Sequence, residues 1–232
     1  MGLEFLEYMG PASKPSTDDS LKLIELRRQM LEAAQANDAL IESFVRALDM
    51  RERETSGHGH RVAEMATRLA RLVLPKGTDL THLRHGALLH DIGKMGVPES
   101  ILHKPGPLDD EEWTVMRRHP QYGYELLSPV PFMRAALEIP ISHHERWDGR
   151  GYPHSLKGEQ IPLAARLFAV VDVWDSLTSE RPYRPAWPQS NALPYIRSQA
   201  GTHFDPAIVE AFISSGLFQT APGQAPSPPI NQ

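Results

Sequence analysis

The chain has 232 residues, of which 41% are hydrophobic and 23% charged, so it can bury a sizeable core. Its formal net charge of −5 argues against binding of duplex nucleic acid, which requires a basic surface. The absence of cysteine excludes disulfides, thiolate metal ligands and cysteine nucleophiles. Any metal ion must therefore be held by nitrogen and oxygen, and the 11 histidines are the first candidates.

The apolar segments of the chain are too short to cross a bilayer. The longest mostly apolar stretch, Leu167 to Val173, is interrupted by Asp172 and falls far short of a membrane span. The N-terminus lacks the charged-then-apolar pattern of a signal peptide. We therefore expect a cytoplasmic protein with no membrane partner.

Both ends of the sequence have the composition of tails. The N-terminal segment contains GPASKPSTDDS and the C-terminal segment reads QTAPGQAPSPPINQ, both rich in Pro and Ser with little to bury. We predict four parts in chain order. They are a mobile tail over 1–20, a helix over 21–39, one folded domain over 40–217 and a second mobile tail over 218–232.

Residues 21–50 have the spacing of a long helix with an apolar seam. No Pro or Gly occurs between Leu21 and Gly57. The seam residues follow each other at alternating steps of three and four: Leu23, Leu26, Met30, Ala33, Asn37, Leu40, Phe44 and Ala47. Over 21–39 two interpretations stay open, a helix lying on its own domain or a parallel coiled coil that makes a homodimer, with Asn37 fixing the register. Beyond Leu40, packing on the domain core is favoured.

The rest of the chain has the signals of an all-α fold. Asp79, the pair Asp109 and Glu112, and Asp205 followed by Pro predict helices that begin near 80, 110 and 206. The run PLAARLFAVVDVWDSLTS is too long for a typical strand and predicts another helix. One long irregular loop is expected over 145–160, where WDGRGYP concentrates Gly and Pro. Such a loop usually serves function.

Histidines and carboxylates with metal-ligand chemistry are spread over five places in the sequence. They are Glu54 with His58, His90 with Asp91, His119, His143 with His144, and Asp172. Any one of them also fits a buried hydrogen-bonded histidine, a helix cap or a surface residue. Two adjacent doublets, with carboxylates before and after them, together favour a metal site.

Four motifs in this order resemble the HD-GYP family of the metal-dependent HD phosphohydrolase superfamily. They are HDIGK at 90–94, HHERWDGRGYP at 143–153, the following IPLAARLFAVVDVWDSLTSERPYR, and GTHFDP at 201–206. The resemblance extends from about Leu40 to Leu217. It implies an all-helical HD-domain bundle with additional helices and a GYP loop. It also implies hydrolysis of cyclic di-GMP to pGpG, and often on to GMP, at two or three iron or manganese ions.

By this resemblance the metal ligands are Glu54, His58, His90, Asp91, His119, His143, His144 and Asp172. Ions bridged by Asp91 would share a water, make hydroxide available near neutral pH and neutralise the attacked phosphate. Lys94 resembles the family lysine that contacts the scissile phosphate. Glu54, one helical turn before His58, is expected to help hold a third ion.

The resemblance also assigns substrate contacts. Arg181 and Arg184 correspond to the basic pair that grips substrate phosphate, although the family often has lysine at the second place. Gly149 and Tyr152 belong to the loop that the family uses for substrate and for protein partners. Asp175, one turn after Asp172, is either support for a histidine ligand or an acid on the helix surface.

Three functions are compatible with these motifs. The favoured one is a cyclic di-GMP phosphodiesterase. The first alternative is a signalling module that keeps the fold and acts by binding another signalling protein at the GYP loop. The second, a general nucleotidase of the wider superfamily, leaves the GYP segment without a role.

Overall fold

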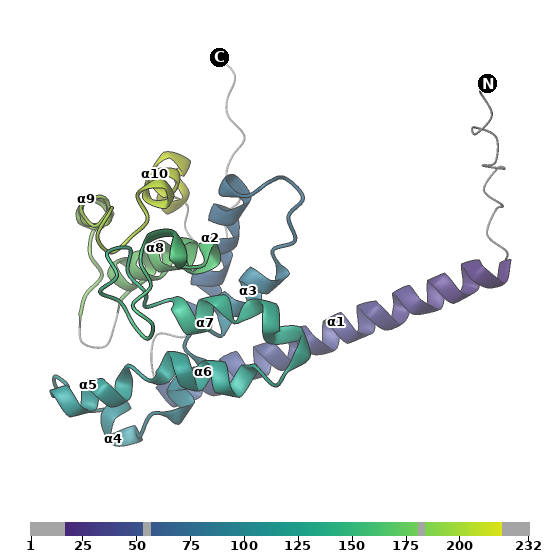
Figure 1. Ribbon diagram of the computed structural model, residues 1–232, viewed down its shortest axis with the longest axis horizontal. Coiled ribbons are helices and arrows are strands. Elements are labelled where there is room, and N and C mark those ends of the chain that lie inside the picture. Colours follow the sequence, from purple (N-terminus) through teal and green to yellow (C-terminus); the bar gives the residue numbers. More distant parts are fainter. Residues whose placement is uncertain (1–16, 53–56, 181–183, 220–232) are drawn as a thin grey trace, which may run out of the picture. The chain divides into compact units, whose positions relative to one another are not determined.

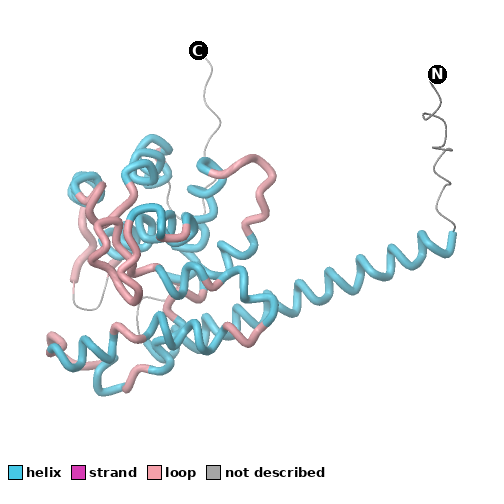
Figure 2. Tube along the Cα trace, viewed as in Figure 1, coloured by secondary structure: helices cyan, strands magenta, loops and turns pink. Residues whose placement is uncertain are grey.

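The computed structural model describes residues 17–52, 57–180 and 184–219, and the chain divides after Leu40 into two compact units. Over these residues every regular element is a helix (Figure 2), and Ala200 and Phe204 form an isolated bridge. The predicted all-α class is therefore confirmed. In the same part of the chain, no helix combines the length and the apolar character needed to span a bilayer.

The helices follow one another along the chain, and their arrangement is seen in Figure 1. In order they are α1 Thr17–Glu52, α2 His58–Val73, α3 Thr81–Leu88, η1 Ile92–Gly96, α4 Glu99–Leu102, α5 Asp110–Met116, α6 His119–Leu127, η2 Pro131–Ala136, α7 Glu138–Ser142, η3 Gly158–Gln160, α8 Leu163–Thr178, α9 Gln189–Ser198, α10 Pro206–Ser215 and η4 Leu217–Gln219, the η elements being 3₁₀ helices.

The first unit consists of the first turns of α1, which are polar on most sides. Lys22 pairs with Asp18 one turn earlier, and Arg28 pairs with Glu25 and Glu32. Such pairs at steps of three and four support an isolated helix by a few tenths of a kcal/mol each, roughly 0.2–0.5. The large apolar side chains of this segment are exposed, as the seam over 21–39 would require if it binds a second helix.

The core of the second unit is built around α2 and α8. Helix α8 is apolar on nearly all sides, with Leu167, Phe168, Val170 and Val171 all buried, which is the pattern of a central helix. Helix α2 packs against α3, α8 and α10. The two acids of α8 therefore lie in the most apolar element of the molecule, where carboxylates need partners.

The last turns of α1 pack on this core through a face that differs from the predicted seam. Ile41, Val45 and Leu48 are buried, whereas Phe44 and Ala47, the seam positions, are only half-buried. A strict seven-residue repeat has 3.5 residues per turn and an α-helix has about 3.6, so the inward face drifts along a straight helix. Packing on the core beyond Leu40 is confirmed, with this shift of face.

The predicted helix starts are also confirmed. Asp109 and Glu112 form a reciprocal capping box at the start of α5. Asp205 accepts a hydrogen bond from the N–H of Ala207 at the start of α10, and α3 begins at Thr81. These local signals fix where helices begin because they satisfy backbone N–H groups that the helix itself leaves free.

The long loop over 145–160 is held by a buried carboxylate. Glu145 accepts hydrogen bonds from the backbone N–H groups of His154 and Leu156, at 2.7 and 2.9 Å. Gly151 lies in its tight turn, where a Cβ atom would come within 2.4 Å of the backbone nitrogen of Arg146. The irregular loop therefore has a defined path beside His144.

The same loop is tied to the GTHFDP segment through the backbone. The N–H of Trp147 donates to the carbonyl of His203, and the N–H of Asp148 donates to the carbonyl of Thr202. Two motifs that are far apart in sequence thus form one folded unit.

Helix α6 packs directly on η1, and a glycine permits this contact. A Cβ atom on Gly93 would lie 1.8 Å from the carbonyl oxygen of His119 and 2.4 Å from the backbone nitrogen of Gly123. Any larger residue would push the two segments apart. The glycine of HDIGK thereby sets the separation between Asp91 and His119.

We predict that Gly93→Ala lowers the free energy of unfolding by about 3 kcal/mol, because its methyl group must displace backbone in two elements. Gly123→Ala is the matched control. Its nearest contact would be an ordinary 3.4 Å, and alanine favours a helix by up to about 1 kcal/mol over glycine. Urea denaturation compares the two variants, and equal stability would contradict this packing.

Candidate active site

Side chains from five places in the chain converge at the middle of the second unit. The structure groups Asp91 with His119, His143 and His144, and it groups His58 with His90 and Asp172, the donor atoms of each group lying within 4.8 Å of one another. All the predicted ligands except Glu54 are thus brought together. Glu54 lies outside the described residues, so its role stays a prediction.

The carboxylate of Asp91 lies between the two groups. Its Oδ1 atom is 3.2 Å from Nε2 of His119 and 3.5 Å from Nε2 of His143. Its Oδ2 atom is 3.1 Å from Nε2 of His90 and 2.8 Å from Nζ of Lys94. One oxygen therefore faces each group, which is the geometry that a bridging carboxylate requires.

The hydrogen bonds of the histidines show what these groups can bind. Nδ1 of His119 lies 2.9 Å from the carbonyl of Met116, and Nδ1 of His143 lies 3.1 Å from that of Pro140. A carbonyl only accepts, so each Nδ1 carries the ring proton and each Nε2 presents a lone pair. The two Nε2 atoms are 3.2 Å apart. Facing lone pairs at this distance repel each other, and a cation placed among them removes the repulsion.

Burial favours the neutral rings that a cation needs. It lowers the pKa of His143, and it lowers the pKa of His144 further, with help from the neighbouring imidazoles. Neutral imidazole nitrogen together with carboxylate oxygen, and no sulfur, suits iron or manganese as well as zinc. The donor set therefore fits divalent metal ions.

In the other group, the imidazole of His58 is hydrogen-bonded to Asp175 through the nitrogen that faces away from Asp172. Nδ1 of His58 lies 2.7 Å from Asp175 Oδ2, and its Nε2 lies 3.3 Å from Asp172 Oδ1. Burial alone would lower the pKa of His58, but the hydrogen bonds to the two carboxylates outweigh it and raise the pKa to about 10. Arg61 donates two hydrogen bonds to the carboxylate of Asp175, of 2.7 and 2.9 Å. The supporting position predicted for Asp175 is what the structure shows.

A cavity of about 310 Å³ opens beside the first group. Its lining combines the polar residues Glu52, Lys94, His119, His144 and Tyr152 with the apolar residues Leu102, Leu108, Trp113 and Met116. A ligand that has both a charged group and an apolar face would fit this lining.

Lys94 and Tyr152 are the predicted substrate contacts that line this cavity. Nζ of Lys94 lies 2.8 Å from both Asp91 and Glu52, so the ammonium group is placed at the edge of the histidine cluster. The ring of Tyr152 stacks on His144 with centroids 4.7 Å apart. Burial raises the pKa of Tyr152, so its hydroxyl stays protonated and can donate a hydrogen bond.

The other predicted substrate contacts do not line the cavity formed by the described residues. The guanidinium of Arg184 donates to the carbonyl of Ser176 and lies 5.7 Å from the ring centroid of Trp187. Gly149 has a positive φ of 81° in the loop, away from the cavity lining. Arg181 lies outside the described residues. Substrate binding by these three residues stays a prediction.

Several residues of the site had not been predicted from the sequence. Arg61 follows His58 by three residues, so their shared helix face was a usable signal. Trp113 and Met116 have the same spacing on α5, but nothing local shows that this face meets the histidines. Glu52 lies beyond the segment predicted as a helix and had no assigned role, and Glu145 is recognised only by its contacts across the loop.

We predict that Asp175→Asn weakens binding of Mn²⁺ by roughly 10- to 100-fold, because the ring of His58 loses the charged acceptor that orients it. Glu64→Gln, an exposed acid on the same helix as His58, is the control and should bind as the wild type does. Calorimetric titration of the metal-free proteins measures both. Unchanged affinity in the folded Asp175→Asn variant would refute this orienting role.

Comparisons with known proteins agree with these motifs. An HD domain family model matches residues 23–208. A cyclic di-GMP phosphodiesterase of Vibrio cholerae is 40% identical over 224 residues, which cover 86% of this chain and 45% of that protein. A 3′3′-cGAMP-specific phosphodiesterase 2 of the same organism is 39% identical over 186 residues, covering 79% of this chain and 36% of that protein.

A solved structure shares the fold. The crystal structure of a cyclic GMP-AMP specific phosphodiesterase of Vibrio cholerae superposes with a TM-score of 0.59 at 21% identity, over 76% of this chain and 47% of that chain. This chain thus spans less than half the length of these three proteins.

Proposed function

The chain belongs to the HD domain family, in its HD-GYP branch, and on that basis we propose that it is a metal-dependent phosphodiesterase that hydrolyses cyclic di-GMP to pGpG. The observation that carries this proposal is the position of the Asp91 carboxylate, with one oxygen toward each group of donors and Lys94 beside it. Phosphodiester hydrolysis needs positive charge on both sides of the attacked phosphate, and this arrangement can hold it there.

The names of the relatives support the substrate class. One of the relatives above is a cyclic di-GMP phosphodiesterase and another is specific for 3′3′-cGAMP. Both substrates are cyclic dinucleotides with two purine bases. We therefore propose that the substrate is a cyclic dinucleotide, and specifically cyclic di-GMP.

We propose Fe or Mn as the ions, held by the two groups described above, with Glu54 as a ligand of a third ion. When bound, such ions lower the pKa of water and neutralise phosphate charge. The protein side chains supply the rest. Backbone carbonyls fix the histidine rings, and Lys94 donates a hydrogen bond to a phosphate oxygen. Tyr152 closes one side of the cavity and can donate from its hydroxyl.

We predict that Asp91→Asn lowers the turnover of cyclic di-GMP by at least about 100-fold, because the amide cannot bridge two cations with two anionic oxygens. Glu138→Gln removes one negative charge from an exposed position on α7 and is the control, with an unchanged rate. Formation of pGpG by protein loaded with metal under anaerobic conditions is followed by chromatography. Wild-type turnover in the folded Asp91→Asn variant would refute the proposed role of the carboxylate.

We also propose that the first turns of α1 pair with the same residues of a second copy in a parallel coiled coil. The seam residues Leu23, Leu26 and Met30 are 49%, 54% and 64% exposed, so this face of the helix is available. Asn37 occupies an a position, where a buried asparagine pair sets the register. The proposed homodimer thus forms through the seam predicted over 21–39.

We predict that the double substitution Leu26→Glu with Met30→Glu converts the dimer to a monomer, because it places like charges in the seam. Leu31→Glu is the control, since Leu31 is 64% exposed but lies off the seam. Light scattering at micromolar concentration measures the mass of each protein. A monomeric wild type would refute the coiled coil.

A further inference from the structure

We infer that Trp113, together with Arg117 and Tyr152, forms a platform on which a purine base of the substrate stacks. The inference rests on the proposed function, since it places a base of the substrate against the apolar residues of a cavity whose polar residues would hold phosphate. It adds a residue that selects the substrate, and it assigns a role to α5.

Arg117 contacts two aromatic rings, and both of these rings line the cavity. The guanidinium carbon of Arg117 is 5.6 Å from the ring centroid of Trp113 and 5.8 Å from that of Tyr152. Tyr152 in turn stacks on His144. A series of ring and guanidinium contacts therefore links His144, through Tyr152 and Arg117, to the indole of Trp113. Cation–π contact with both rings holds the guanidinium in place.

The exposure of Trp113 is not explained by packing. Its side chain is 42% exposed, and neither α4 nor α5 contains a buried residue. The tryptophan therefore contributes little to the hydrophobic core. A large aromatic ring left open beside a polar cluster is typical of a binding surface.

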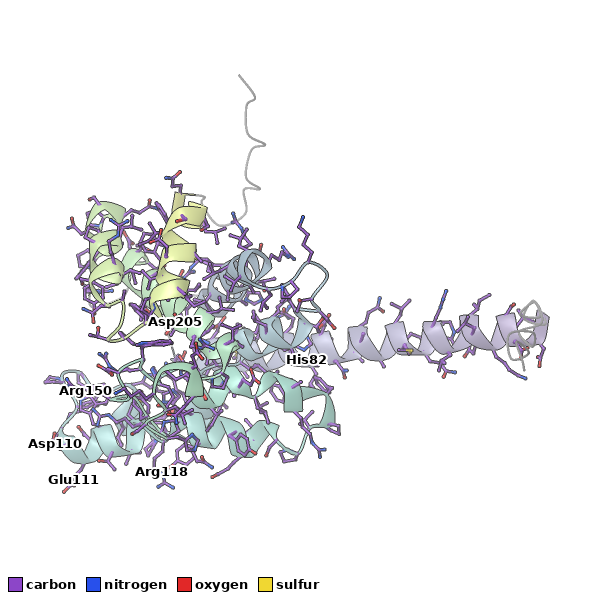
Figure 3. All side chains as sticks on the ribbon, turned by 45° about the horizontal axis from the view of Figure 1, so that its top comes forward. His82, Asp110, Glu111, Arg118, Arg150 and Asp205 are labelled. Carbon is purple, nitrogen blue, oxygen red and sulfur yellow. The ribbon has the colours of Figure 1, made fainter. Side chains whose placement is uncertain are left out.

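Local contacts keep α5 folded without the help of its tryptophan. Glu112 takes part in the capping box with Asp109 and also pairs with Lys104 at 2.5 Å. Glu111 projects outward from the first turn of α5 (Figure 3). Trp113, two residues later and so on the opposite side of the helix, lines the cavity together with Met116.

The shape and chemistry of the cavity fit a purine nucleotide. The apolar residues Leu102, Leu108 and Met116 lie around the same cavity as Trp113. A base offers a flat apolar face to such a wall, and the phosphate attached through its sugar can then reach Lys94 among the polar residues. Purines have a larger stacking face than pyrimidines, so this platform favours purine-containing cyclic dinucleotides.

The test compares two replacements of Trp113 in the manganese-loaded full chain. Trp113→Leu keeps an apolar side chain but removes the aromatic face, and Trp113→Phe keeps a smaller aromatic face. Stacking on an aromatic side chain is worth about 5- to 100-fold in binding of one base. We expect Trp113→Leu to raise KM for cyclic di-GMP by at least about fivefold with a smaller change in kcat. Trp113→Phe should restore most of this loss.

A second readout separates stacking from a merely structural role. Wild-type protein is expected to bind cyclic di-GMP more tightly than cyclic di-UMP, and Trp113→Leu should narrow this difference. Tyr124→Leu, at a 41% exposed aromatic residue of α6 outside the cavity lining, is the control with unchanged KM and preference.

The outcomes distinguish the platform from the function on which it rests. Wild-type turnover of cyclic di-GMP with an unchanged KM in Trp113→Leu, or equal losses in Trp113→Leu and Trp113→Phe, would overturn the platform alone. Failure of the wild-type protein to bind or hydrolyse cyclic di-GMP would overturn the phosphodiesterase and the platform together.

Discussion

The site depends on one buried carboxylate that is shared among imidazoles. Burial would raise the pKa of Asp91, but the positive charges of His90 and Lys94 hold it well below its usual value. The carboxylate is therefore ionised, and it faces nitrogen lone pairs that point to the same space. Such an arrangement is costly in an apolar core unless positive charge is present. The rest of the fold supplies the rigidity that keeps these donors together.

The histidine rings are held rigidly because each lies at or just beyond the end of a helix. His90 follows α3, His119 opens α6, and His143 with His144 follows α7. Near these helix ends, backbone carbonyls are available to accept the Nδ1 proton, as the carbonyl of Ala87 does for His90 at 2.9 Å. The sequence thus places each ring where its orientation is fixed by its own neighbours. The contact of η1 with α6 at Gly93 then sets the distance between two of these ends.

The ligand cluster could be predicted from the sequence because its signals are local. Adjacent His–Asp and His–His doublets, combined with an acid inside the apolar helix α8, favour a metal site over separate packing or capping roles. The hydrogen-bond network that joins His58, Asp175 and Arg61 could be predicted only in part. The reason is that Arg61 and Asp175 are 114 residues apart in sequence. The buried face of α1 beyond Leu40 lies one residue further along the chain than predicted. A seven-residue pattern has 3.5 residues per turn, whereas an α-helix has about 3.6, so the buried face shifts along the helix.

The apolar wall of the cavity was harder to predict for another physical reason. Trp113 lies on a helix with no buried residues, so burial patterns carry no information about it. Its position follows from the way α5 is anchored and from the course of the GYP loop, which Glu145 holds through two backbone N–H groups. The capping box of α5 could be predicted, but it does not show which face of the helix meets the histidines, and the Glu145 contacts join residues that the local sequence does not specify.

The central claim is that this site hydrolyses a cyclic dinucleotide with the help of bound metal ions. The most direct measurement is the conversion of cyclic di-GMP to pGpG by the anaerobically purified full chain, before and after chelation and after reloading with Mn²⁺ or Fe²⁺. We predict turnover in the loaded protein, its loss on chelation and its recovery on reloading. Turnover that survives complete removal of metal, or no turnover in protein shown to contain the ions, would contradict this account.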